Sequence, residues 1–179
     1  MDYSSSTAVT ISTILGVVGA IMVFLRYIYF FSSLQINFPA LTAQLVKLVQ
    51  ADNVDRALKL CRIVNNNYAV KSFAAILEGY QQGPDYFQDS QAKGDELLGI
   101  GLRRNKFMRL LSFAGVLLAF LPLIQALAFN LLIIPRMYII AAIAVFFFVL
   151  SELKNITFFK QYYKSREDLI SAIQAKNRS

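Results

Sequence analysis

Long uncharged stretches dominate the pattern of this chain. Residues 7–25 contain no charged side chain, and residues 110–150 contain only Arg136. A hydrocarbon core of ~30 Å is crossed by a helix of about 20 apolar residues. The first stretch is therefore long enough for one crossing, and the second for two crossings joined by a tight turn near Asn130 and Pro135. We predict an all-α membrane protein with three transmembrane helices, at about 8–29, 110–129 and 132–150.

The segments outside these stretches have the period of amphipathic helices. Leu41, Leu45 and Leu48 share one helical face, and Asn53 is a candidate N-cap for the helix that follows. Gly83-Pro84 predicts a helix stop, after which a further helix starts near Asp85 and runs into the second crossing. We divide the chain into a first transmembrane helix (1–34), a cytoplasmic helical loop (35–109), a transmembrane hairpin (110–153) and a cytoplasmic C-terminal helix (154–179).

The distribution of basic residues predicts the topology. No Lys or Arg precedes Arg26, whereas ten lie within residues 35–109 and six follow residue 150. The positive-inside rule places the N-terminus outside and both the loop and the C-terminus in the cytoplasm. The net charge of +7 is thus a topology signal and a contact for anionic lipids rather than a sign of nucleic-acid binding. The predicted membrane-anchor and lipid-contact residues are Arg103, Arg104, Lys106 and Arg109.

The first apolar stretch has a competing interpretation as a cleaved signal peptide. A signal peptide begins with a basic segment, whereas Asp2 is the only charge before Arg26. The stretch also continues into Arg26 and the aromatic residues 27–31, which are typical of a membrane interface. We therefore expect an uncleaved anchor.

The composition argues against an enzyme. Of the 179 residues 56% are hydrophobic, none is histidine and only Cys61 is cysteine. Histidine is the commonest metal ligand and a frequent general base. A Gly-rich phosphate loop and a nucleophile with an adjacent base are also missing from the sequence. We predict no catalytic residue, no metal site and no cofactor.

Polar residues in or near the crossings are the candidates for function. The ion-path candidates are Glu152, Asn155, Gln125 and Ser112. Glu152 is either a proton or cation site at a pore mouth, or an interfacial residue that is hydrated or paired with a base such as Lys154 or one from the second crossing. Gln125 is a candidate for a hydrogen bond between helices or for contact with a substrate.

Three segments carry a resemblance to a known family. Residues 52–61 (DNVDRALKLC) resemble a short alanine-leucine-cysteine helix of the TolQ/ExbB/MotA family, the channel subunits of ion-driven motors in bacterial inner membranes. Residues 69–80 (AVKSFAAILEGY) resemble the helix that follows it, and residues 155–159 (NITFF) resemble the exit from the third span. The order of one span, a helical loop of about 75 residues, a two-span hairpin and a tail is also similar.

This resemblance implies a membrane subunit of an ion-driven motor in the bacterial inner membrane. The chain would form a homo-oligomeric pore, as a homo-pentamer, around single-span partners of the TolR/ExbD type. The family's second span has a Gly-rich, threonine-containing run, whereas residues 112–129 (SFAGVLLAFLPLIQALAF) have a single glycine and no threonine. Residues 137–150 (MYIIAAIAVFFFVL) lack the threonine and proline of the family's third span. The pore would then be non-conducting; the alternative is a membrane scaffold or assembly protein that docks other membrane proteins.

Overall fold

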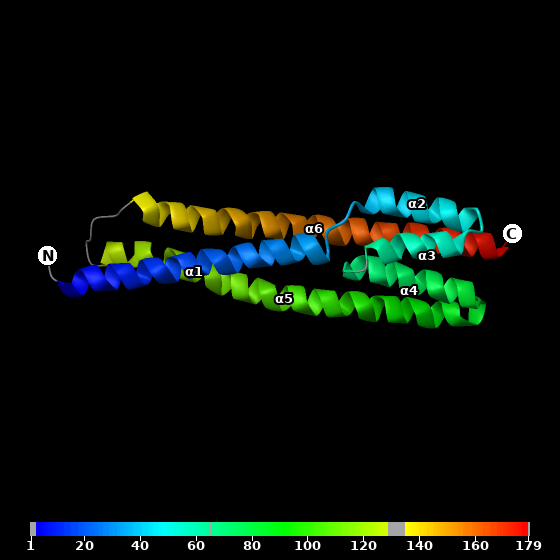
Figure 1. Ribbon diagram of the computed structural model, residues 1–179, viewed down its shortest axis with the longest axis horizontal. Helices are drawn as coiled ribbons and strands as arrows, with labels where there is room; N and C mark the ends of the chain where they lie inside the picture. Colours follow the sequence, from blue (N-terminus) through cyan, green and yellow to red (C-terminus); the bar gives the residue numbers. More distant parts are fainter. Residues whose placement is uncertain (1–2, 65, 129–134, 179) are drawn as a thin grey trace. The chain divides into compact units, whose positions relative to one another are not determined.

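The computed structural model describes residues 3–64, 66–128 and 135–178, which form six helices and no strand (Figure 1). The turn predicted near Asn130 lies outside the described residues. The helices are α1 (Tyr3–Ser33), α2 (Phe38–Gln50), α3 (Val54–Ile63), α4 (Tyr68–Gln82), α5 (Pro84–Ala128) and α6 (Pro135–Arg178).

Helices α1, α5 and α6 each contain a stretch that is long and apolar enough to span a membrane. This confirms an all-helical chain with three candidate transmembrane helices. The placement of the N-terminus outside and of the C-terminus in the cytoplasm stays a prediction.

The helix boundaries follow local sequence signals. Gly83 ends α4 with φ at +124°, a conformation that favours glycine, and Pro84 begins α5, where its missing N–H costs nothing. The expected cap at Asn53 was wrong, because its side chain makes no capping hydrogen bond. At the start of the next helix, α4, Asn67 does cap: its backbone is extended and its Oδ1 accepts from the N–H groups of Ala69 and Val70.

The chain divides into two compact units, which we describe separately. The membrane unit comprises the described residues of 1–30 and 105–154, and the loop unit comprises those of 31–104 and 155–179. Helices α5 and α6 each contribute to both units.

The membrane unit packs through small residues. A Cβ added to Gly115 on α5 would lie 2.6 Å from the carbonyl oxygen of Gly19 on α1, so the two backbones touch. Val23, Ala119 and Ala144 form the buried centre, one from each helix. Large apolar side chains face outward, as lipid contact requires, among them Ile14, Ile21, Phe113, Leu117, Ile124, Ile139 and Phe146.

The loop unit has the opposite distribution, with aromatic residues inside. Phe38, Phe73, Phe158 and Tyr162 are buried, and the rings of Phe73 and Tyr162 stack at 5.4 Å. The Tyr162 hydroxyl and Ser72 Oγ share a buried hydrogen bond of 2.8 Å. Three helices therefore meet at this core, namely α2, α4 and α6.

Consecutive helices of the loop unit lie side by side. Helix α2 packs on α3 and α3 packs on α4 (Figure 1). Helix α4 turns back on α5 at Gly83, and the close approaches of Gly79 to Ser90 and of Gly94 to Ser72 fix the antiparallel register. Small residues at these positions let the two helices approach closely.

Candidate functional site

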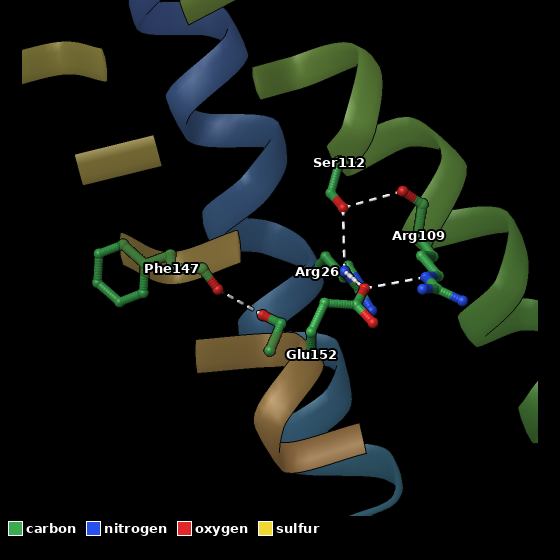
Figure 2. Close-up of polar contacts among 6 residues, drawn as sticks. Arg26, Arg109, Ser112, Phe147 and Glu152 are labelled. Atoms are coloured by element: carbon green, nitrogen blue, oxygen red, sulfur yellow. Dashed lines mark hydrogen bonds and ion pairs between the residues drawn. The ribbon is translucent and has the colours of Figure 1, made fainter. Parts of the chain in front are cut away.

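The charged residues that border the three apolar stretches meet within the membrane unit. Arg26 follows the apolar run of α1, Arg109 precedes that of α5, and Glu152 follows that of α6. Figure 2 shows the three side chains converging, with Ser112 beside them. We call Arg26, Arg109, Ser112 and Glu152 the charge cluster.

One carboxylate oxygen holds the charge cluster together. Glu152 Oε1 lies 2.8 Å from Arg26 Nη1 and 2.9 Å from Arg109 Nε. Arg26 Nη1 also donates to Ser112 Oγ at 3.3 Å, and Ser112 Oγ donates to the carbonyl oxygen of Arg109 at 3.0 Å (Figure 2). The cluster thus links α1, α5 and α6 at one end of their apolar stretches.

The three charged residues differ sharply in burial. Arg26 is 0% exposed, Glu152 21% and Arg109 57%. The ring of Phe148 lies 5.7 Å from Arg26 Cζ and covers the guanidinium with an aromatic face. A buried charge is tolerated only when it is paired and hydrogen-bonded, so Glu152 is what permits Arg26 to be buried.

The pairing of Arg26 is nevertheless incomplete. Its Nε and Nη2 are buried and make no hydrogen bond in the described part of the chain. The cluster contains two positive charges against one negative charge, which leaves one positive charge in excess.

The structure brings two of the ion-path candidates together, Glu152 and Ser112. Two interpretations were left open for Glu152, and the observed geometry matches the one in which it pairs with a base. One such base is Arg109, which borders the second crossing. The predicted alternative partner Lys154 makes no ion pair with Glu152. Asn155 falls in the loop unit.

Gln125 has a different setting. It lines a pocket of about 420 Å³ between α1 and α5 whose other walls are mostly apolar, including Ile11, Leu15 and Leu121. Its Oε1 is buried and accepts no hydrogen bond from a described residue. The hydrogen bond between helices expected of Gln125 is therefore not formed by this oxygen within one chain.

The predicted lipid-contact residues are all exposed. Arg103 and Arg104 belong to the loop unit, whereas Lys106 and Arg109 belong to the membrane unit. Arg109 is exposed, as contact with lipid requires. It also forms an ion pair with Glu152, which was not predicted for this residue by name.

Arg26 is the residue that sequence reasoning missed. Its position after an apolar run, next to Tyr27, suggested an interfacial anchor, but it is the most buried charge of the cluster. One signal existed in the sequence: Arg26 is the only base bordering the first run, and Glu152 is the only carboxylate bordering the other two.

Three hydroxyl groups of the membrane unit are engaged by their own helices. Ser12 and Thr13 both donate to the carbonyl oxygen of Val9, and Ser151 Oγ donates to that of Phe147. Such bonds satisfy a hydroxyl without a second helix. Among the described residues, no group of three or more His, Cys, Asp or Glu side chains is placed to hold a metal ion.

Cys61, the one thiol of the chain, lies in the loop unit. It is 2% exposed, and burial raises the pKa of its thiol to about 12. A thiol reacts as its thiolate, so this cysteine is an inert core residue at neutral pH.

Comparisons of this chain with models of protein families, with curated proteins and with solved structures give no match.

Proposed function

We propose that this chain is a membrane subunit of a TolQ/ExbB/MotA-like complex in the bacterial inner membrane. In this proposal several copies form a homo-oligomeric pore, a pentamer as in the family, around single-span partner helices. The subunit itself does not relay ions. The proposal extends the resemblance seen in residues 52–61, 69–80 and 155–159.

The arrangement of the helices is the observation that carries the proposal. Three apolar helices belong to one unit, and two of them, α5 and α6, run for 45 and 44 residues and contribute to the amphipathic loop unit as well. This is the layout expected of the family. The loop unit has its own buried core of aromatic side chains.

The ion pairs and hydrogen bonds made by the polar side chains support a subunit that does not conduct ions. Ion conduction requires groups that replace the hydration shell of the ion or accept its proton. Glu152 is held by two arginines, and the hydroxyls of Ser12, Thr13 and Ser151 are bonded to their own helices. These side chains stabilise the membrane unit and offer little to a passing ion.

Proton flux into liposomes tests this part of the proposal. The purified full chain is reconstituted with an internal pH-sensitive dye, and a proton gradient is applied with gramicidin as the positive control. The expected result is a flux equal to that of protein-free liposomes. A flux above that of protein-free liposomes would overturn the proposal, and its loss in a Glu152→Gln variant that keeps its helicity by circular dichroism would make Glu152 a proton relay.

A non-conducting scaffold that docks other membrane proteins is the second candidate. The exposed Lys47 and Arg56 beside the apolar pocket of α2 and α3 favour it, because this pocket suits a soluble partner with acidic and apolar side chains. The two candidates differ in composition: a motor subunit purifies as a ring with single-span partners, whereas a scaffold purifies in a one-to-one complex with another protein.

A further inference from the structure

The excess positive charge of the charge cluster points to a missing anion. Arg26 and Arg109 share one carboxylate oxygen of Glu152, and no other carboxylate pairs with them among the described residues. The cluster borders the apolar stretches of all three helices. In helices that span a membrane, this is the level where lipid headgroups begin. An uncompensated charge at this level attracts anions from the membrane surface.

We propose that Arg109 binds the phosphate of an anionic phospholipid. Arg109 is 57% exposed and contacts Glu152 through Nε, and no acceptor among the described residues pairs with the two terminal nitrogens of its guanidinium. Arginine binds phosphate through two parallel N–H bonds, a geometry that lysine does not offer. Arg26 is fully buried and is not accessible to such a ligand.

The contacts of Glu152 suggest how the phosphate is accommodated. When Arg109 turns to the phosphate, Glu152 Oε1 loses one of its two cationic partners. The carboxylate of Glu152 then pairs with Arg26 alone, whose Nη2 is buried and lacks a hydrogen bond. The two-to-one cluster becomes two neutral pairs, Arg26 with Glu152 inside and Arg109 with the phosphate at the surface.

Lys106 lies one turn before Arg109 on α5 and is also exposed. Residues three apart on a helix are neighbours, so Lys106 adds positive charge beside the proposed phosphate position. The site is formed within one chain and does not depend on the oligomer proposed above.

Native mass spectrometry of the full chain in detergent tests the site. The probes are phosphatidylglycerol and phosphatidylcholine with identical acyl chains, titrated separately. Wild-type protein should bind phosphatidylglycerol about tenfold more tightly than phosphatidylcholine, and Arg109→Gln should abolish this preference. Circular dichroism is expected to show unchanged helicity, because Arg109 is largely exposed.

Three comparisons make the result specific. Lys154→Gln removes one positive charge from the membrane unit without touching Glu152, and it should keep the preference. Arg26→Met/Glu152→Gln frees Arg109 without leaving a charge buried, and it should keep or tighten phosphatidylglycerol binding. Arg109→Lys should retain only part of the preference, because the fork of donors is lost.

Other outcomes overturn the proposal. Equal losses in Arg109→Gln and Lys154→Gln would mean general attraction of anionic lipid with no site. Weaker binding in Arg26→Met/Glu152→Gln would contradict the exchange of partners. If excess inorganic phosphate displaced phosphatidylglycerol completely, the anion site would stand but its occupant would be free phosphate rather than lipid.

Discussion

The two units of this chain each contain an arginine–carboxylate pair of nearly the same length. In the membrane unit, Arg26 and Glu152 are 2.8 Å apart with exposures of 0% and 21%. In the loop unit, Arg166 and Asp95 are 2.9 Å apart with exposures of 21% and 57%. The first pair lies among apolar residues, where water cannot readily take the place of either charged partner. The second pair lies at a polar surface, where it can.

This difference extends to the whole of each unit. The loop unit places aromatic residues inside and its charges outside, so its stability comes from apolar burial. The membrane unit places apolar residues on both its inside and its outside, and its helices are held by close backbone contacts and by the charge cluster. An ion pair is therefore expected to contribute more to stability in the membrane unit, which has the fewer charged side chains, than in the loop unit.

The largest effect is expected from Glu152→Leu. This change leaves Arg26 buried without a counter-charge, which costs about 3–5 kcal/mol. The free energy of unfolding in detergent, followed by circular dichroism, measures the loss. The double variant Arg26→Met/Glu152→Leu removes both charges and should recover most of the stability. A double variant as unstable as the single one would show that the pair is not what Glu152 contributes.

The second effect concerns the close contact of α1 and α5. A Cβ at residue 19 would overlap the carbonyl oxygen of Gly115, so Gly19→Ala should destabilise the membrane unit by about 1–3 kcal/mol. Gly99→Ala is the matched control, because a Cβ there meets nothing within 4 Å. It should stabilise α5 by up to about 1 kcal/mol through helix propensity. If the two variants unfold at the same temperature, the helices do not touch as described.

The third effect is confined to the loop unit and depends on pH. Burial raises the pKa of the Cys61 thiol from 9.0 to about 12, so the folded state holds this proton more tightly than the unfolded chain. The resulting stabilisation is fully present below pH 9.0 and is lost as the pH rises toward 12. The slope contributed by Cys61 is at most about 1.4 kcal/mol per pH unit.

Cys61→Ala isolates this contribution from other groups that titrate at high pH. Burial also raises the pKa of Tyr162, so stability falls in alkaline solution even without the thiol. Urea unfolding of the wild type and the variant between pH 8 and pH 11 should give curves that diverge as the pH rises. Parallel curves would mean that Cys61 is accessible to water.

The smallest effect is expected at the surface pair of the loop unit. Asp95→Asn should change the free energy of unfolding by less than about 1 kcal/mol, because partly exposed pairs gain little over hydration. The measurement is the same as for Glu152→Leu, and the contrast between the two is the result of interest. A loss at Asp95 as large as that at Glu152 would remove the distinction between the units.

Much of the fold was predictable because it depends on local patterns. Continuous apolar runs predict the three long helices whatever the rest of the chain does, and Gly83-Pro84 marks a turn through backbone preferences alone. Which asparagines cap their helices was not predictable in this way. Asn53 precedes α3 and Asn67 precedes α4, but only the side chain of Asn67 accepts hydrogen bonds from the N–H groups of its helix.

The candidate site was only partly predictable because it depends on contacts between distant segments. Glu152 is conspicuous as a carboxylate beside an apolar run, and pairing was among its expected fates. Arg26 looked like one more interfacial base, since nothing near it in the sequence reveals that α6 brings a carboxylate to it. The burial of Arg26 also depends on Phe148, which comes from the same distant helix.

The central claim is that this chain works as a homo-oligomeric ring around single-span helices. Native mass spectrometry of the complex, extracted gently from its own membrane, tests that claim most directly. The account predicts five copies of this chain together with one or two copies of a single-span protein. A monomer, or a one-to-one complex with another protein, would contradict the ring and favour the scaffold.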